Sequence, residues 1–223
     1  MEYIDLRRED GSLTGEVKER SLVHRDGDLH GTSHVWLIRY RGDRQSADVL
    51  LQKRSRNKDS FPGSYDISSA GHIPSGVDFL DSALRELEEE LGIRAKAEEL
   101  IYAFTHIGHH EAEFYGKVFK NHEYSRVYLY ECELSIEEMH LQGEEVESVL
   151  WMDYQECLEH IRRGDLNHCI FPDEFERLAV EIESYFARTG RPLGKKALTE
   201  TWAEDAQAEL EDWIEEQGIY IRQ

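Results

Sequence analysis

Hydrophobic and polar side chains alternate in several short segments of the chain, which is typical of half-buried β-strands. Residues 3–6 and 13–17 alternate in this way on either side of the Asp10-Gly11 pair, so we expect a β-hairpin over about residues 1–20. Apolar runs that favour further strands lie at residues 34–40, 49–54, 65–69, 100–104, 126–132 and 146–152. The pattern predicts a sheet whose strands are spread over most of the chain.

One segment has the period of an amphipathic helix instead. Between residues 78 and 91 the apolar side chains recur every three or four positions, at Leu80, Ala83, Leu84, Leu87 and Leu91. Gly92 follows at the position where helices commonly end. We therefore expect a helix over residues 78–91 with one apolar side and one acidic side.

Further helical patterns gather towards the C-terminus. Residues 153–161 predict a short helix, and residues 172–223 contain two helical patterns separated by residues 189–192. Residues 55–64 and 105–125 are expected to be loops. Strands interleaved with a few helices predict a mixed α/β fold with a helical C-terminal extension.

Composition narrows the class of protein. The 223 residues include 47 Asp or Glu against 26 Lys or Arg, and the net charge of -21 disfavours broad contact with long nucleic acid or an anionic membrane. The chain shows neither a signal peptide nor an apolar run long enough to span a membrane. Three cysteines without metal-ligand spacing are typical of a reducing compartment, so we expect a cytoplasmic protein.

The acidic side of the expected helix carries the first candidate chemistry. Glu86, Glu89 and Glu90 are three and four positions apart, so their carboxylates share one side of the helix and repel one another. Hard divalent cations such as Mg²⁺ or Mn²⁺ relieve this repulsion by taking oxygen ligands. Considered alone, the same residues could equally be a solvated acidic surface.

The setting of these acids resembles the Nudix box, G-x5-E-x7-R-E-U-x-E-E-x-G-U with U aliphatic. Eight of its nine defined positions match, namely Gly71, Arg85, Glu86, Leu87, Glu89, Glu90, Gly92 and Ile93. The departure is Val77, where the family has a Glu that supports the box Arg. Asp81, four residues before Arg85, could take over that pairing on the helix.

The resemblance extends over roughly residues 3–160 and is greatest to the branch that contains isopentenyl-diphosphate isomerases. It implies an α/β/α sandwich with a mixed central sheet, in which residues 1–165 form the Nudix domain, including the N-terminal hairpin. Residues 166–223 are then a helical extension that packs on the domain or on a partner subunit, for example in a homodimer. The isomerases place a catalytic Cys just before Gly71-His72, and residues 66–70 contain none.

The resemblance also implies residue roles. Glu86, Glu89 and Glu90, with the Gly71 carbonyl, would bind Mg²⁺ or Mn²⁺. The catalytic group would comprise Arg85, Glu89, Glu90 and a further acid from a distal segment. Our choice for this acid is Glu145, with Glu144 next, as a base or an extra ligand; both could equally be solvated acids of a turn.

Basic residues and histidines offer candidates for substrate binding. Lys53, Arg54, Arg56 and Lys58 are the densest basic stretch and could contact phosphate, or could form a solvated edge. His72 follows the loop glycine and could face the phosphates or a second metal, as the matching His of the isomerases is a metal ligand, or it could equally be a packed or surface histidine. His24, His30 and His34 resemble the isomerase region that supplies histidine ligands, although without isomerase chemistry they could be structural.

These observations favour a metal-dependent pyrophosphohydrolase that cleaves a small organic diphosphate. The substrate would be a nucleoside diphosphate linked to another group, or a prenyl-type diphosphate. Two alternatives stay open: an isomerase, which the missing Cys disfavours because the reaction needs the proton of a thiol, and a non-catalytic domain that senses a ligand. A small anion chelated to a cation is compatible with the acidic charge balance, whereas a polyanion is not.

Overall fold

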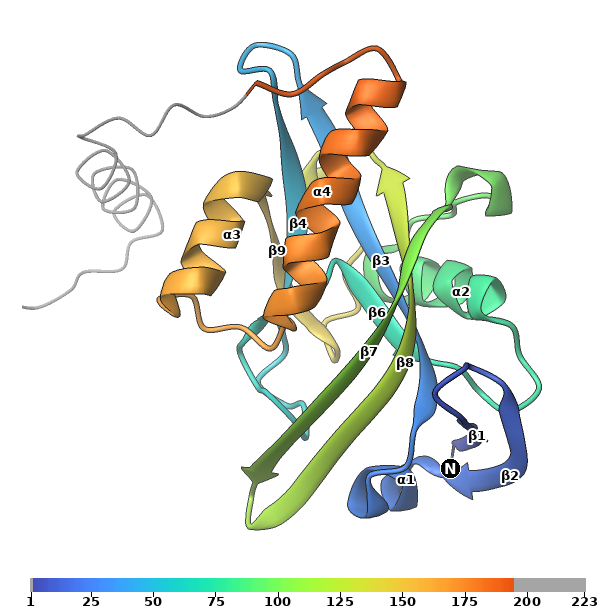
Figure 1. The fold of residues 1–223 in the computed structure, drawn as a ribbon. Coiled ribbons are helices and arrows are strands. Elements are labelled where there is room, and N and C mark those ends of the chain that lie inside the picture. The colour runs from blue at the N-terminus through green and yellow to red at the C-terminus, as the bar shows by residue number, and fades with distance from the viewer. Residues whose placement is uncertain (1, 195–223) are drawn as a thin grey trace, which may run out of the picture. The chain divides into compact units, whose positions relative to one another are not determined.

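The computed structural model describes residues 2–194 (Figure 1). The strands are β1 (Tyr3–Arg7), β2 (Leu13–Glu19), β3 (His30–Arg41), β4 (Ser46–Arg54), β5 (Tyr65–Asp66), β6 (Ser69–His72), β7 (Ile101–Phe114), β8 (Lys117–Glu131) and β9 (Val146–Asp153). The α-helices are α1 (Arg20–Asp26), α2 (Phe79–Leu91), α3 (Tyr154–Arg163) and α4 (Pro172–Arg188). Two short 3₁₀ helices are Ala97–Glu99 and Ile136–Glu138.

Strand β3 lies at the centre of a mixed sheet. It pairs antiparallel with β1, β4 and β6 and parallel with β8, which in turn pairs antiparallel with β7. On the other side, β4 continues the sheet through antiparallel pairs with β5 and β9. Strands from the two ends of the described chain thus meet around one central strand.

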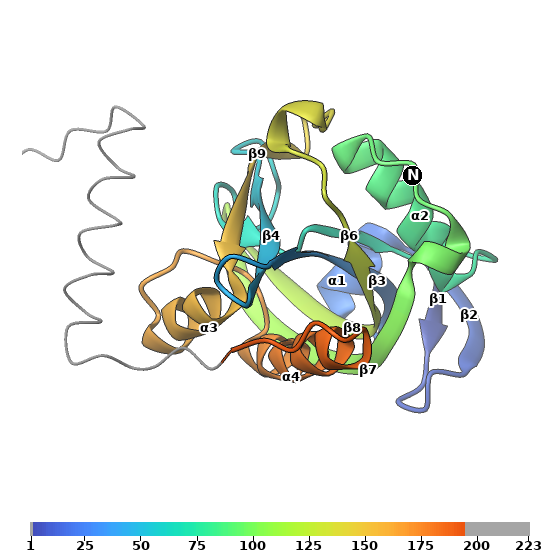
Figure 2. The same cartoon turned by 90° about the horizontal axis from the view of Figure 1, so that it is seen from above.

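Helices cover both faces of this sheet, and Figure 2 shows α2 on one side with α3 and α4 on the other. Because successive side chains of a strand point to opposite faces, β3 serves both layers. Trp36 and Ile38 belong to the core beneath α3 and α4, whereas Val35 and Leu37 belong to the core beneath α2. The expected α/β/α sandwich with a mixed sheet is therefore confirmed.

Local sequence signals account for the elements predicted correctly. The expected hairpin forms β1 and β2, and the expected helix forms α2. The side chain of Asp78 accepts a hydrogen bond from the backbone N–H of Leu80 at the start of α2, and Gly92 ends the helix with φ of 70°. No helix within residues 2–194 is long and apolar enough to cross a membrane.

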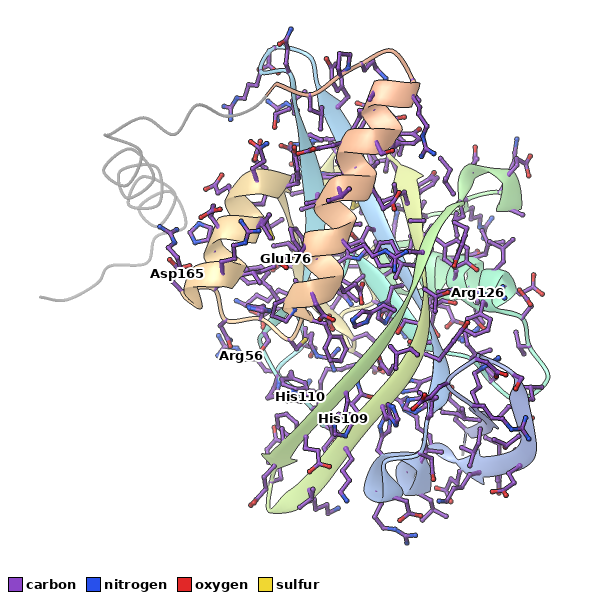
Figure 3. All side chains as sticks on the ribbon, in the orientation of Figure 1. Arg56, His109, His110, Arg126, Asp165 and Glu176 are labelled. Carbon is purple, nitrogen blue, oxygen red and sulfur yellow. The ribbon has the colours of Figure 1, made fainter. Side chains whose placement is uncertain are left out.

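The expected loop over residues 105–125 is wrong, because β7 and β8 form one long hairpin there. Its outer half extends away from the rest of the sheet, and His109 and His110 lie on it (Figures 1 and 3). In that half the exposure of β7 still alternates, and Phe114 packs on Phe61 and Phe119. Its inward-facing positions include Gly108, His110 and Ala112, which are too small or too polar to give the apolar alternation that marks a half-buried strand. The seven-residue helix α1 was also not predicted, since it is too short to show a helical period.

Helix α4, which falls in the segment assigned to the C-terminal extension, completes the core on its side of the sheet. Phe175, Leu178, Ile182 and Phe186 are buried there, and one compact unit extends as far as Leu193. The second helical pattern of the extension lies outside the described residues. The division at residue 165 into a domain and an extension stays a prediction.

If α4 is part of the core, truncating its buried face should destabilise the whole unit. Phe175→Ala should lower the free energy of unfolding by about 3–5 kcal/mol, because it removes a fully buried ring and leaves a cavity. Val180→Ala, at a position that is 64% exposed on the same helix, should change it by less than about 0.5 kcal/mol. Urea unfolding followed by circular dichroism measures both. Equal effects of the two substitutions would contradict this placement of α4.

Candidate active site

Helix α2 places its acids at three different depths. The Glu90 side chain is buried, Glu86 is half-buried, and Glu89 is exposed to solvent. The Glu90 carboxylate accepts a hydrogen bond from the backbone N–H of Ala70 at 3.3 Å, which ties the helix to strand β6. The acidic side of α2 therefore faces β6 and is not simply a solvated surface.

Gly71 of β6 makes room for Glu86. A Cβ atom at residue 71 would lie 2.3 Å from the Glu86 carboxyl carbon, so any side chain there would displace this carboxylate. The backbone of residue 71 and the Glu86 carboxylate are consequently in direct contact. That the Gly71 carbonyl and the helix acids bind one cation stays a prediction.

Burial makes the two inner acids costly to ionise. Burial, together with the charge of the neighbouring Glu86 carboxylate, raises the pKa of Glu90 to about 8. Burial also raises the pKa of Glu86. A divalent cation would offset both the desolvation and the mutual repulsion, and carboxylate and carbonyl oxygens are the donors that Mg²⁺ and Mn²⁺ prefer. Glu86, Glu90 and Gly71 therefore fit such an ion.

Arg85 lies between two acids of the box. Its guanidinium donates to Glu86 Oε1 at 2.6 Å and to Glu89 Oε2 at 2.8 Å. In the described residues Arg85 does not pair with Asp81 as expected, because its guanidinium points towards the C-terminal end of the helix, where Glu86 and Glu89 lie. Val77, at the position of the missing Glu, is 37% exposed in the loop before α2.

A cavity of about 120 Å³ opens beside these acids, between β3, β6, β8 and the loop at 55–64. Its lining includes Arg20, His24, Thr32, His34, Arg54, Lys58, Asp66, Gly71, His72, Asn121, Glu123 and Cys169. We call this cavity the pocket. The lining is mixed in charge and mostly polar, as expected of a site for a small charged ligand.

Only two of the four residues of the basic stretch line the pocket. Arg54 and Lys58 line it, whereas Lys53 and Arg56 pair with Glu147 outside it. Arg54 is also held by Asp66 at 2.9 Å. The Arg56 side chain is 81% exposed, and Figure 3 shows it at the edge of the molecule. The structure thus brings only Arg54 and Lys58 of the four to the candidate site.

Glu145, the acid chosen as base or extra ligand, lies next to the pocket without lining it. Its carboxylate forms an ion pair with Lys58. Its backbone carbonyl accepts a hydrogen bond from the backbone N–H of Ser55 at 2.9 Å, which fixes the start of the basic loop. Glu145 is therefore within reach of the site through Lys58, and its role stays a prediction.

Three histidines form a second group that could hold a cation. Ring nitrogens of His24, His30 and His72 all lie within 4.8 Å of one another, and the Nε2 atoms of His24 and His72 are 3.0 Å apart. Nδ1 of His24 lies 3.3 Å from the Lys120 carbonyl, and Nδ1 of His30 lies 2.9 Å from the Asp28 carbonyl. These carbonyls select the tautomers whose Nε2 atoms carry the lone pairs.

The electrostatics of this cluster suit a metal ligand better than a phosphate contact. Burial lowers the pKa of His24 to about 4 and lowers the pKa of both His30 and His72. The rings are therefore neutral at pH 7, and Nε2 of His30 is buried without a hydrogen-bond partner among the described residues. Neutral His72 lines the pocket but offers no positive charge to a phosphate, and its role in substrate binding stays a prediction.

Two further pocket residues had no local signal in the sequence. Glu123 of β8 is buried, and burial would raise its pKa, but the hydrogen bond and the charge of His34 outweigh this and lower the pKa to about 2. Cys169 enters the pocket from the segment between α3 and α4, and burial raises the pKa of its thiol. Only the pairing of distant strands brings these residues together.

Comparisons with known proteins agree with this picture. A family model described as the NUDIX domain matches residues 31–172. The protein named Nudix hydrolase 3 of Arabidopsis thaliana is 40% identical over 168 residues, which are 74% of this chain and 21% of that protein. An uncharacterized Nudix hydrolase of Clostridium acetobutylicum is 37% identical over 155 residues, which are 70% of this chain and 71% of that protein.

One relative is an isopentenyl-diphosphate isomerase, and one solved structure has a similar fold. An isopentenyl-diphosphate Delta-isomerase of Paenarthrobacter aurescens is 33% identical over 100 residues, 41% of this chain and 47% of that protein. A crystal structure of a Deinococcus radiodurans protein superposes with a TM-score of 0.58 at 18% identity, covering 79% of this chain and 98% of that one. At this identity the superposition supports the fold alone.

The buried carboxyl of Glu90 should make the metal-free protein lose stability as the pH rises. Its pKa in the fold is above the unfolded value of 4.5, so the cost of ionising it in place grows from about pH 4.5 to about pH 8. Glu90→Gln removes this cost. In buffers with a chelator, the variant should be more stable than the wild type by on the order of 3 kcal/mol at pH 8 and by much less at pH 5. Thermal unfolding across this range measures the difference, and a difference independent of pH would contradict the placement of Glu90.

Proposed function

This chain belongs to the Nudix family, and we propose that it is a metal-dependent pyrophosphohydrolase that cleaves a small organic diphosphate. The observation that supports this most is the burial of Glu86 and Glu90 against Gly71, at the edge of a pocket that also contains Arg54 and Lys58. Buried acids and cationic side chains at one place suit an anion that arrives together with a cation, although Arg54 and Lys58 are paired with Asp66 and Glu145 in the free protein. An acidic chain needs both to accept a diphosphate.

Different residues of the chain would bind the cation, orient the phosphates and accept the proton. Glu86, Glu90 and the Gly71 carbonyl would hold Mg²⁺ or Mn²⁺, which supplies a Lewis acid that polarises a phosphoryl oxygen and acidifies water. Lys58 and Arg54 would orient the phosphates from the opposite wall. Exposed Glu89, or Glu145 beside Lys58, would accept the proton of the attacking water.

The pocket and the charge balance limit the substrate class. The pocket's small volume and its basic residues suit a diphosphate group, so the remainder of the substrate would extend out of it. A nucleoside diphosphate linked to another group and a prenyl-type diphosphate both meet this description. The overall charge of -21 still disfavours a long nucleic acid or an anionic membrane as a partner. A cytoplasmic location and a homodimer stay predictions.

One observation favours a second activity, the isomerisation of an allylic diphosphate. The pocket places a protonated thiol, Cys169, and an ionised carboxylate, Glu123, in the same cavity, which are a proton donor and a proton acceptor. Isomerisation would interconvert two five-carbon diphosphates without release of phosphate, so one assay separates the two reactions. Tight ligand binding in calorimetry without turnover of either kind would favour a sensor domain.

The hydrolase proposal is tested by removing the charge of single box acids. With Mg²⁺ and a panel of diphosphates, Glu89→Gln and Glu90→Gln should each lower kcat roughly 10²-fold, because a proton acceptor or a cation ligand is lost. Glu88→Gln is the matched control, since Glu88 lies on the same helix and pairs with Arg94 away from the pocket. Phosphate release measures all three. Absence of turnover in the wild type, or full turnover in both acid variants, would refute the proposal.

The two pairs of basic residues should differ in their effect on substrate binding. Lys58→Gln should raise KM about tenfold, which corresponds to about 1.4 kcal/mol, because a cation of the pocket wall is lost. Arg56→Gln should leave KM within about twofold, since its side chain faces solvent beside Glu147. Steady-state kinetics on the best diphosphate of the panel decide this. A larger effect at Arg56 than at Lys58 would place the phosphate site elsewhere.

A further inference from the structure

A fully buried acid of α4, Glu174, lies behind the pocket. Its side chain is 0% exposed, although it comes from the first turn of a helix. It accepts hydrogen bonds from Nδ1 of His34 at 2.9 and 3.1 Å and from Nε1 of Trp36 at 3.1 Å. Nδ1 of His106 lies 3.3 Å away from it. The His34 and Trp36 side chains of β3 thus donate to one acid of α4, and His106 of β7 lies against it.

His34 connects this acid to the pocket. Its other ring nitrogen, Nε2, lies 3.4 Å from Oε2 of Glu123 and 3.3 Å from Oγ1 of Thr32. The remaining oxygen of Glu123 accepts a hydrogen bond from Nδ2 of Asn121 at 2.8 Å. A line of contacts therefore runs from Glu174 through His34 to Glu123, and both oxygens of Glu123 have defined partners.

The charges along this line alternate in sign. Burial would lower the pKa of His34, but the charges of Glu174 and Glu123 outweigh it and raise the pKa to about 10. The imidazolium in turn keeps the pKa of Glu123 low. At neutral pH the pocket wall therefore presents a fixed carboxylate, Glu123, beside the positively charged His34, and the second carboxylate, Glu174, lies behind His34.

We propose that His34 and Glu174 are positioning residues that hold the Glu123 carboxylate in place at the pocket wall during the reaction. This inference rests on the proposed hydrolase function, to which it adds the Glu123 carboxylate as a group that acts in the pocket, and it makes α4 a functional part of the site. Glu123 lies opposite His30 in the pairing of β3 with β8. A small rotation of the Glu123 side chain therefore moves its carboxylate relative to the histidine cluster. Misplacement of a charged group by about 1 Å can cost on the order of 10²-fold in rate.

Stability alone does not account for such an arrangement. Burying a triad of charged groups costs desolvation that their attraction only partly offsets, and apolar side chains of similar volume would commonly serve the core as well or better. The surrounding core is apolar, with Phe175 and Leu178 following directly on α4. A charged line that ends at the pocket instead suits the orientation of a pocket residue.

The inference is tested by removing the charge of Glu174 while keeping its shape. Glu174→Gln should lower kcat for the best diphosphate by roughly ten- to a hundredfold and leave KM within about threefold, because Lys58 and Arg54 still bind the phosphates. Asp173→Asn is the matched control on the same turn, since the Asp173 side chain is 74% exposed and contacts His106 from the outside. It should keep the kcat of the wild type.

A double-mutant cycle separates positioning from general destabilisation. If Glu174 acts through Glu123, then Glu174→Gln should lower kcat little further in a Glu123→Gln background, whereas independent effects would multiply. Glu174→Asp keeps the charge and should recover part of the lost rate, which also covers the case that Glu174→Gln does not fold. Unchanged kcat in Glu174→Gln, or fully multiplicative losses, would overturn the inference.

A measurement without substrate distinguishes this inference from the proposed function. Nitrogen-15 NMR of labelled histidine should show both ring nitrogens of His34 protonated at pH 8 in the wild type and not in Glu174→Gln. A neutral His34 in the wild type would overturn the inference whatever the activity. A wild type that releases phosphate from no diphosphate would instead overturn the hydrolase proposal, while the NMR result still decides whether Glu174 keeps His34 charged.

Discussion

The pairing of β3 with strands on both of its sides is the constraint on which the rest of the structure depends. Antiparallel pairing with β6 brings Gly71 and His72 beside β3, and parallel pairing with β8 brings Glu123 opposite His30. Because β3 turns alternate side chains to each face, the same strand fills the core beneath α2 and the core beneath α4. The acids of α2, the histidine cluster and the pocket all take their positions from this one strand.

The sequence predicts the half of the site that is local along the chain. The box acids, Arg85 and Gly71 lie within 23 residues, so the helical period together with the resemblance to the Nudix box predicts them as one group, although Gly71 belongs to strand β6 and not to a loop. The opposite wall was not predicted as a unit. Glu123 and Cys169 belong to no motif in the sequence, and they become pocket residues only through the register of β8 and the course of the chain before α4.

The local sequence pattern also fails to predict part of the fold. The inner half of β7 and β8 has apolar runs and was predicted as strands, whereas the outer half alternates in exposure but carries few large apolar side chains on its inner face. In the basic stretch, residues that look alike in the sequence have different positions in the structure. Its four cations are equivalent in the sequence, and the alternation of β4 together with Glu147 separates Arg54 and Lys58 from the other two.

The parallel pair of β3 and β8 has a consequence for the order in which the protein folds. It joins His30 to Glu123, so a long stretch of chain must be ordered before the pair can form, and such non-local contacts form late. Helix α2, with its cap at Asp78 and its stop at Gly92, depends only on neighbouring residues and can form early. During synthesis the acids of the box are therefore made well before β8, the strand that completes this side of the sheet. The contacts that perturb Glu90 come from residues close to it in the chain, such as Ser69 and Ala70 of β6, whereas Glu123 meets the histidines only after β8 has paired with β3.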